Sequence, residues 1–594
     1  MLRAPIIQLA LVVTVLAGAL LILHGWTGVP DGASYRHNIP WMDGFYAAFW
    51  SGDVYPRRIS GLWYGLGGLD FYFYAPMPFW VSSLAGPLLA PGGGADAALA
   101  AGGAVMIALS AASFYAFARH FYAHGFALAG ALIYAVLPYH YLTNWFMRQA
   151  VGEVAAMAVI PLVALGAAQL MSTPRRGGRL LATSFAALTL CHLPGALITA
   201  LFIAAMTGFH LLRPRPVPEP MSARVREAAP FVLWGGLGAA LGALYWLPAL
   251  ALLDEVSSSL LFNAYATPTN WFLLDGQPEL NPVTMSVVRM QFVALAVAAL
   301  GLIIARRGSD GTALSWALGP LLFGAVMMTP VSAPLWTHTP LQAAQFPWRS
   351  NMIVDLGLAL ALVEFLRQWH TGAGRRTLCA AMGGIGLLAI VQTGLTALPH
   401  AAGAAERGRA LDGEALATGA AEYLPPAVYE AIDARFEAAG TEARSSAAQY
   451  QSWFSEARMV RDEATADAAA DARAMNVIDV TGQRIRIAVD MGPDGGDLRV
   501  PIPYWHHWQA RLDGTGASLS LRPEPSLGIT VITLPPGLNR VTFVLRPTAA
   551  ERLASAVSLL AAMILLMSLA GRIALQLRQP AFRAGKLDEA PNAG

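Results

Sequence analysis

The chain has 594 residues, of which 56% are hydrophobic and only 13% are charged, and its formal net charge is +2. Soluble domains carry about 25% charged residues, so this composition excludes an ordinary soluble enzyme and predicts a polytopic α-helical membrane protein. The small net charge gives no reason to expect a nucleic-acid partner. Both cysteines, Cys191 and Cys379, lie in apolar stretches, so a disulfide framework is not expected.

The first apolar run, residues 6–23, follows Arg3 and is long enough to cross a bilayer. No small-residue cleavage site follows this run, only His24, Gly25 and Trp26. We therefore interpret it as a retained transmembrane helix and not as a cleaved signal peptide.

Further apolar runs predict the remaining spans, although several are shorter than the roughly 20 residues that a spanning helix needs. They cover residues 78–89, 97–117, 126–137, 151–170, 180–209, 231–253, 287–305, 313–328, 352–366, 378–397 and 553–569. The sequence therefore predicts about 11 to 13 transmembrane helices.

Clusters of basic residues set the expected orientation, because loops rich in Lys and Arg stay in the cytoplasm. The clusters are Arg175, Arg176 and Arg179; Arg213, Arg215, Arg224 and Arg226; Arg306 and Arg307; Arg375 and Arg376; and Arg572, Arg578, Arg583 and Lys586. This places segments 254–286, 329–349 and 398–552 outside the membrane and the C-terminal tail in the cytoplasm.

Two segments do not fit a simple alternation of crossings. Residues 180–209 lie between two cytoplasmic clusters and contain the helix breaker His192-Leu193-Pro194-Gly195. A re-entrant hairpin or a broken pair of helices is expected there, with its irregular backbone lining a protein cavity. Between the first loop and Pro138, three apolar runs occur where an even number of crossings is needed, so one short run does not cross; the sequence leaves open which.

Residues 398–552 have a different composition from the rest. The part from 398 to 475 is rich in Ala, Glu and Arg at helical spacing, whereas 476–550 alternates with period two and holds turn signals such as Asp494-Gly495-Gly496. The sequence therefore predicts a transmembrane domain (1–397) with a long first outer loop (25–77). An extracytoplasmic helical segment, a small antiparallel β-sandwich-like domain, and a last transmembrane helix with a tail (551–594) follow.

The first outer loop carries the most chemistry, with Asp31, His37, Asp43, Arg57 and Arg58 among aromatic residues. Long ordered connections are usually functional, and a carboxylate at a membrane surface can act as a general base toward a hydroxyl. The aromatic residues of the stretch 39–50 suit a helix lying in the plane of the interface. The alternative is that Asp31 only caps this region and the aromatic residues form an interfacial belt.

Three further candidates lie on the expected outer side. Arg148 and Glu153 open a transmembrane helix, where ionisable groups are functional candidates; they could equally form a simple loop ion pair. Arg349 places a guanidinium where a lipid phosphate would lie, or it anchors the interface together with Trp348. His192 either belongs to the site or is simply packed at the helix break.

The sequence holds no Walker motif, no GxGxxG before a helix, no HExxH and no CxxC. Coupling to ATP and a zinc site therefore have no support among the motifs. No cofactor is predicted, and a requirement for a divalent metal stays open.

A combination of motifs spread over nearly the whole chain resembles a known family. The motifs are Asp31 with His37; Gly52-Asp53-Val54-Tyr55-Pro56-Arg57-Arg58; Tyr72-Phe73-Tyr74-Ala75-Pro76-Met77-Pro78; Arg148 with Glu153; His192-Leu193-Pro194; Gln345-Phe346-Pro347-Trp348-Arg349; Tyr504-Trp505-His506-His507-Trp508; and Leu534-Pro535-Pro536-Gly537. The family they resemble is the bacterial "6-pyruvoyl-tetrahydropterin synthase-related" membrane proteins. One departure is Arg58, where that family leads us to expect Trp.

Despite that label, nothing here is similar to the zinc-binding His cluster of the soluble pterin synthase. The architecture instead resembles the GT-C superfamily of polytopic glycosyltransferases, which share a long first outer loop with an acidic residue. Similar members, such as oligosaccharyltransferases, use sugars carried on polyprenyl phosphate. The resemblance implies a multi-pass protein of the bacterial inner (plasma) membrane with its β domain on the periplasmic or extracellular side.

These observations lead to the hypothesis of a GT-C-like glycosyltransferase that moves a sugar from a polyprenyl-phosphate carrier to a glycan, lipid or protein acceptor. Asp31 would be the general base, with Asp43 as the alternate, and His37 would orient it or contact the sugar. The departing phosphate would be held by Arg349, Arg148 and Arg57; Arg58, Glu153 and His192 complete the predicted substrate-binding set. The alternatives are a transporter or flippase of a lipid-linked saccharide, for which the intramembrane Asp355 and the helix break at Pro194 speak, and a non-catalytic membrane assembly protein.

Overall fold

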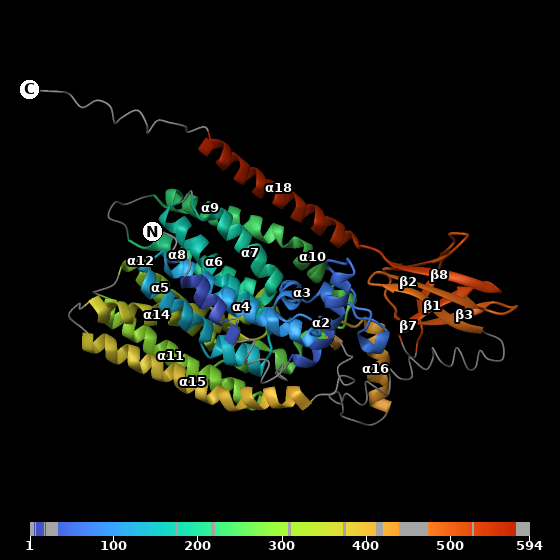
Figure 1. The fold of residues 1–594 in the computed structure, drawn as a ribbon, viewed down its shortest axis with the longest axis horizontal. Coiled ribbons are helices and arrows are strands. Elements are labelled where there is room, and N and C mark those ends of the chain that lie inside the picture. The colour runs from blue at the N-terminus through green and yellow to red at the C-terminus, as the bar shows by residue number, and fades with distance from the viewer. Residues whose placement is uncertain are drawn as a thin grey trace, which may run out of the picture.

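The computed structural model describes residues 5, 8–16, 18–19, 34–173, 176–214, 220–306, 310–371, 376–410, 420–438, 473–525 and 528–577. From residue 34 on, the described α-helices are α2 (Tyr35–Trp50), α3 (Met77–Leu89), α4 (Ala95–Ala118), α5 (His124–Val136), α6 (Val151–Ser172), α7 (Gly178–Cys191), α8 (Leu193–Leu212), α9 (Met221–Leu241), α10 (Ala243–Ala251), α11 (Pro282–Ala305), α12 (Gly311–Met327), α13 (Ala333–His338), α14 (Asn351–Thr371), α15 (Arg376–Ala410), α16 (Pro426–Ala438) and α18 (Ala549–Leu577). The helices form an elongated bundle, and the strands form a separate domain at one end of it (Figure 1).

Seven of the described helices are long and apolar enough to cross a membrane, and two sharply bent helix pairs raise the number to nine if each pair is one span. The protein is therefore a polytopic α-helical membrane protein. The number is below the expected 11 to 13 for identifiable reasons. Helices α3 and α7 have 13 and 14 residues, and the first apolar run lies partly outside the described residues. Helix α14 has 21 residues and is buried, but it carries ionisable side chains.

The ambiguity between the first loop and Pro138 is resolved by helix length. Helix α5 continues into a π-helix, η3 (Tyr139–Met147), and together they form one candidate span of 24 residues. Helix α4 is the other long helix in this region, whereas α3 would rise only about 20 Å at 1.5 Å per residue, too short for a bilayer core. The short run that does not cross is therefore α3 by length. The expected break in residues 180–209 is confirmed, because α7 ends at Cys191 and α8 begins at Leu193.

The first outer loop is a packed part of the protein. Trp41 and Phe45 of α2 are 3% and 0% exposed, and they pack with Phe71 and Phe79 in one aromatic cluster. Trp41 and Phe45 therefore face the bundle, whereas Trp50 of the same helix is exposed, and the interpretation of the stretch 39–50 as a helix in the plane of the interface stays a prediction. Burying large rings contributes strongly to stability, so the cluster fixes α2 against the bundle.

The β domain consists of two antiparallel sheets. Its strands are β1 (Arg473–Thr481), β2 (Arg484–Asp490), β3 (Gly496–Pro503), β4 (Trp508–Leu512), β5 (Ser518–Leu519), β6 (Leu521–Pro523), β7 (Ile529–Leu534) and β8 (Leu538–Leu545). One sheet has the order β1-β2-β8-β4-β5 and the other β3-β7-β6. Alternate residues of β2, β3, β7 and β8 point into one shared apolar core, as expected for strands with period-two patterning.

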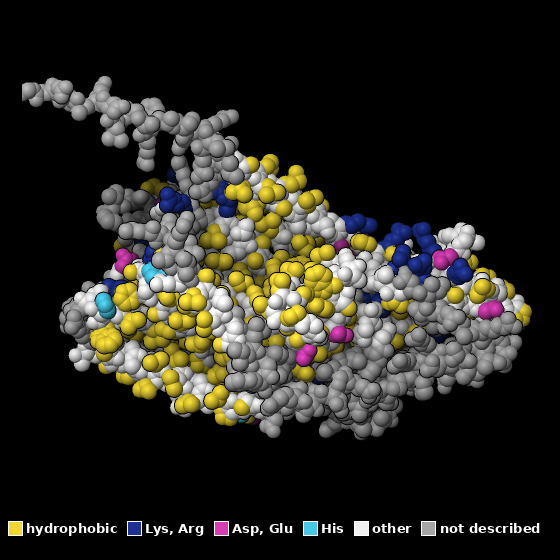
Figure 2. Space-filling model, in the orientation of Figure 1, with side chains coloured by type: hydrophobic (Ala, Val, Ile, Leu, Met, Phe, Trp, Pro, Cys, Tyr) yellow, Lys and Arg dark blue, Asp and Glu magenta, His cyan; other side chains and the backbone are white. Residues whose placement is uncertain are grey.

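The last helix returns the chain to the bundle. A reciprocal capping box begins α18, in which Thr548 N–H donates to Glu551 and Glu551 N–H donates to the Thr548 hydroxyl. Helix α18 then packs along α10 and α9 (Figure 1). Hydrophobic side chains cover the flank of the bundle in the view of Figure 2, and Lys and Arg side chains gather toward the β domain.

Candidate functional site

The centre of the candidate site is Glu153, in the first turn of α6 and 1% exposed. Arg148 donates two parallel hydrogen bonds to the Glu153 carboxylate, from Nη1 to Oε2 and from Nη2 to Oε1, and both are 2.8 Å long. Arg349 donates from Nε to Oε1 at 3.0 Å, and the Tyr139 hydroxyl donates to Oε2 at 3.0 Å. One buried carboxylate therefore holds two guanidinium groups that lie 5 and 196 residues away in sequence.

Arg148 is placed by an irregular backbone. The π-helix η3 ends at Met147, and Gln149 then adopts a positive φ of 47°, a conformation that costs a non-glycine residue free energy. The two together turn Arg148 back over the first turn of α6. Asn144 Oδ1 also accepts from Arg148 Nη1 at 2.8 Å, which fixes the plane of the guanidinium group. π-helical segments are frequent at functional sites.

Arg349 is placed by a short aromatic platform before α14. The rings of Phe346 and Trp348 stack with centroids 4.4 Å apart, and Trp271 packs edge-on to Trp348. Gln345 has a positive φ of 61°, and its side chain donates to Leu261 O at 2.9 Å. Arg349 is held over the Phe346 ring, with Nη1 donating to Ala344 O at 2.8 Å.

His192 lies against the same carboxylate region. It caps α8, with Nδ1 accepting from the Gly195 backbone N–H at 3.0 Å. A Cβ on Gly152 would lie 3.0 Å from Cys191 O and 3.3 Å from the His192 ring, so Gly152 permits this close approach. The helix break therefore brings His192 beside Glu153.

The first outer loop joins the cluster through the start of α2. Ser34 N–H donates to Arg148 O at 3.0 Å, and Asn38 donates to Gln149 O at 2.6 Å. The His37 ring stacks on Trp41, whose own ring lies 4.4 Å from that of Tyr74. The charges of Arg148, Glu153 and Arg349 act on Tyr74 in turn. The His37 end of the loop is thus next to the ion cluster.

The cluster has a net positive charge, because two arginines surround one carboxylate. Among the described residues, Nη2 of Arg349 makes no hydrogen bond, since the hydrogen bonds of Arg349 use Nε and Nη1. The side chains of Arg148 and Arg349 remain 15% and 13% exposed. Such a group can bind an anion and is unsuited to a metal cation, since guanidinium groups supply only donors.

The remaining predicted residues lie elsewhere. Arg57 donates to Leu244 O of α10 and stacks on Tyr55. Arg58 is 2% exposed and donates to Leu66 O at 3.0 Å, and it lies over Trp508 of the β domain. The structure does not bring Arg57 or Arg58 to the Glu153 cluster.

Neither of the two predicted catalytic carboxylates, Asp31 and Asp43, is seen in the Glu153 cluster. Asp43 is exposed on the side of α2 away from the buried residues Asn38, Trp41 and Phe45, so it also lies outside the cluster. Asp31 lies outside the described residues.

Several members of the cluster were not predicted. Tyr139, Asn144 and Gln345 complete the hydrogen bonds of Glu153, Arg148 and Arg349. They sit inside the stretches that the sequence had singled out, yet no motif distinguishes them from neighbouring polar residues, because their role depends on a π-helix and on two positive φ angles.

Asp70 is a second unpredicted acidic residue and is fully buried in the first outer loop. Its Oδ1 accepts from Trp41 Nε1 at 2.9 Å and from Ala420 N–H at 3.0 Å, while Oδ2 has no partner among the described residues. Asp70 therefore connects the first outer loop to Ala420, which follows α15 in the chain. An acidic residue inside the run Leu69–Tyr74 was the signal that could have revealed it.

Asp70 predicts a pH dependence of stability. Burial raises its pKa to about 7 from an ordinary value of 3.8, more than its two hydrogen bonds lower it. As the pH rises, the Asp70 carboxyl therefore loses its proton in the unfolded state before it does so in the folded state. The contribution of protonated Asp70 to the free energy of unfolding is complete below about pH 4 and is lost as the pH rises toward 7. We expect the apparent melting temperature of the detergent-solubilised protein to fall over this range more steeply in the wild type than in Asp70→Asn. Equal slopes would contradict the assignment.

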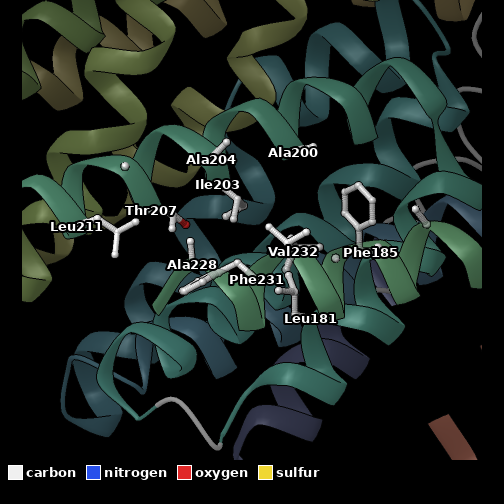
Figure 3. Close-up of a pocket in the computed structure, with 15 residues that line it drawn as sticks. Leu181, Phe185, Ala200, Ile203, Ala204, Thr207, Leu211, Ala228, Phe231 and Val232 are labelled. Carbon is white, nitrogen blue, oxygen red and sulfur yellow. The ribbon is translucent and has the colours of Figure 1, made fainter. Parts of the chain in front are cut away.

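An apolar pocket lies elsewhere in the helical bundle. It has a volume of about 610 Å³ and lies between α6, α7, α8 and α9. The labelled side chains in Figure 3 are apolar except for Thr207. Val163, its lining residue on α6, is about 15 Å along the helix from Glu153 at 1.5 Å per residue. The pocket therefore does not include the ion cluster.

Comparison with known proteins gives two kinds of result. No family model matches the sequence, and no curated protein matches it. Among solved structures, the mycobacterial arabinofuranosyltransferase AftD is similar with a TM-score of 0.40 and 19% identity, over 68% of this chain and 27% of that chain. The oligosaccharyltransferase of Archaeoglobus fulgidus is similar with a TM-score of 0.39 and 14% identity, over 75% of this chain and 59% of that one.

The chain thus spans about a quarter of the length of AftD and less than two thirds of the oligosaccharyltransferase. At these TM-scores and identities the similarity carries no functional argument by itself. The function proposed below rests on the residues of the site.

Proposed function

We propose that this protein is a GT-C-like glycosyltransferase that transfers a sugar from a polyprenyl-phosphate carrier to an acceptor on the outer face of the inner membrane. The observation that carries the proposal is the net positive charge of the Glu153 cluster, together with the Nη2 donor of Arg349, which makes no hydrogen bond to the described residues. A fixed, partly buried guanidinium pair is suited to a phosphate, because its donors match two oxygens at once.

The reaction follows from these charges. An acceptor hydroxyl oxygen attacks the anomeric carbon of the sugar, and the bond between that carbon and the phosphate oxygen breaks. The polyprenyl phosphate leaves with the bonding electron pair, and a general base takes the hydroxyl proton. Arg349 and Arg148 stabilise the charge that develops on the leaving phosphate, at no cost of reorganisation because Glu153 already fixes them.

We assign the general base to Asp31. It precedes Ser34 by three residues, a length of chain that spans at most about 11 Å, and Ser34 is hydrogen-bonded to Arg148. His37 follows on the first turn of α2, where it can orient the base or contact the sugar. Asp43 is less suited, because it lies on the exposed side of α2.

The test of this assignment is a pair of matched substitutions. In a deletion strain complemented with Asp31→Asn, we expect glycolipid and surface-glycan profiles to match those of the empty deletion strain, since loss of a general base costs about 10²–10⁴-fold in rate. Asp43→Asn is the matched control and should retain the wild-type profile. If both variants, expressed at wild-type level, leave the glycans unchanged, neither carboxylate is the base.

A flippase of a lipid-linked saccharide is the second candidate. Asp355 is fully buried in α14, and its Oδ1 accepts from Gln291 of α11; buried ionisable residues in membrane helices often mark transport pathways. The two sharply bent helix pairs also fit transporters with broken helices. Reconstituted liposomes separate the two candidates: movement of labelled carrier lipid without any sugar transfer would favour the flippase.

A further inference from the structure

Three metal-ligand side chains meet where the β domain joins the helical bundle. Glu255 follows α10 in the short turn η4 (Leu253–Glu255), and His506 with His507 precedes β4. The Nε2 atom of His507 is 2.9 Å from Glu255 Oε2, and that of His506 is 3.5 Å from Oε1. One ligand atom from each residue lies within 4.8 Å of the others.

The arrangement is close to that of a tetrahedral zinc site. Zn²⁺ binds imidazole nitrogen and carboxylate oxygen at about 2.0–2.2 Å, which places ligand atoms about 3.3–3.6 Å apart. Shifts of about 1 Å would bring the three side chains to that spacing. Two imidazoles favour zinc or a similar transition metal over calcium or magnesium, which prefer oxygen ligands.

A neighbouring side chain fixes the orientation of the Glu255 carboxylate. Trp505 Nε1 donates to Glu255 Oε2 at 2.8 Å, the kind of second contact that orients a metal ligand. The Trp505 ring packs edge-on to Tyr72 of the first outer loop. The side chain of His506 is 58% exposed, so the fourth coordination position faces solvent and could hold water.

A hydrogen bond alone accounts for only part of this geometry. It explains His507, whose Nε2 lies within bonding distance of both carboxylate oxygens. It does not explain why the exposed ring of His506 turns its Nε2 toward the same carboxylate, with the two imidazole centroids 4.1 Å apart. Glu551 is the other acidic group that acts on His507, but its Oε2 is occupied by the capping bond to Thr548.

We propose that Glu255, His506 and His507 bind one divalent transition metal ion, zinc or a close equivalent, and that this ion fixes the β domain to the helical bundle. In the sequence, His506 and His507 follow Glu255 by 251 and 252 positions. The ion would thus close a contact between two domains. The proposal does not depend on the sugar-transfer function.

The test uses the full-length protein in detergent, purified without a polyhistidine tag because such a tag would itself bind zinc. The protein is treated with EDTA and dialysed, and zinc sulfate is then added. After unbound zinc is removed, bound metal is measured by inductively coupled plasma mass spectrometry. We expect about one zinc ion per chain in excess of background and a higher apparent melting temperature than with EDTA. Calcium and magnesium chloride should give neither effect.

Three variants and a control decide between a metal site and a simple hydrogen bond. His506→Ala and His507→Ala should each weaken zinc binding at least about tenfold. Glu255→Gln still accepts a hydrogen bond from Trp505 but is a poor metal ligand, so it should lose zinc while remaining folded. His338→Ala, an exposed histidine of α13, should bind zinc as the wild type does.

The proposal is overturned if the wild type binds no zinc above background once zinc sulfate has been added, or if His506→Ala and Glu255→Gln bind as much zinc as His338→Ala. Because His506 is exposed, its replacement should not prevent folding. That variant therefore keeps the test decisive even if His507→Ala is unstable.

Discussion

Replacing Arg349 with methionine is expected to lower sugar transfer by about 100-fold or more, the loss typical when one fixed charge-stabilising donor is removed from an active site. Methionine keeps much of the side-chain volume but cannot bind a phosphate oxygen. The measurement is the amount of product formed by membranes that contain equal amounts of wild-type or variant protein. Binding of polyprenyl phosphate to the purified protein should weaken in parallel, whereas binding of the uncharged polyprenol should not change.

Two further variants control this result. Arg289→Met removes an exposed arginine near the start of α11 and should leave transfer unchanged. Arg349→Lys keeps the charge but loses the planar donor pair, so only partial activity is expected. If Arg349→Met transfers sugar as fast as Arg289→Met does, Arg349 has no part in binding the leaving phosphate.

Glu153→Ala is expected to destabilise the protein by about 3–5 kcal/mol, the usual cost of removing one partner from a buried ion pair. Here the cost falls at the upper end, because the substitution leaves two partly buried guanidinium groups without their shared carboxylate. The measurement is the unfolding free energy in detergent with increasing denaturant, or the apparent melting temperature where unfolding is irreversible.

The control for this substitution is Glu279→Ala, since Glu279 is exposed in the segment before α11. It should change stability by less than about 0.5 kcal/mol. The double variant Arg148→Met with Glu153→Ala should be less destabilised than the sum of its two single variants, because it removes one of the stranded charges. Additive losses would mean that the two side chains do not form the ion pair.

Composition and periodicity predicted the broad fold well. Apolar runs located the helices, and period-two alternation located strands such as β2, β7 and β8. The continuation of α5 through Pro138 into a π-helix could not be predicted, because it depends on packing around Tyr139 and His140 and not on local propensity. The resemblance to the pterin synthase-related family stays a prediction, since no family model matches the chain.

The candidate site could be predicted only in part, because tertiary contacts decide which of the candidate residues meet. Arg148 and Glu153 were chosen as ionisable residues at a membrane-helix end, Arg349 as a guanidinium where a lipid phosphate would lie, and His192 for its place at the helix break. The structure brings these four together. Arg57 and Arg58 had the same appearance in sequence but bind backbone carbonyls instead. Which buried arginine faces a carboxylate depends on tertiary contacts between distant segments, and the same is true of the Glu255, His506 and His507 cluster.

The spacing of the two arginines around Glu153 has a consequence for how the protein is made. Arg148 lies only five residues from Glu153, so the start of α6 can enter the membrane as a neutral pair, which lowers the cost of inserting a charged residue. Arg349 follows 196 residues after Glu153, which at ribosomal speed means about 10 to 40 s later. The extra positive charge is therefore added only after α6, α7 and α8 have been synthesised and shortly before α14 follows, so the site acquires its net positive charge late in biosynthesis.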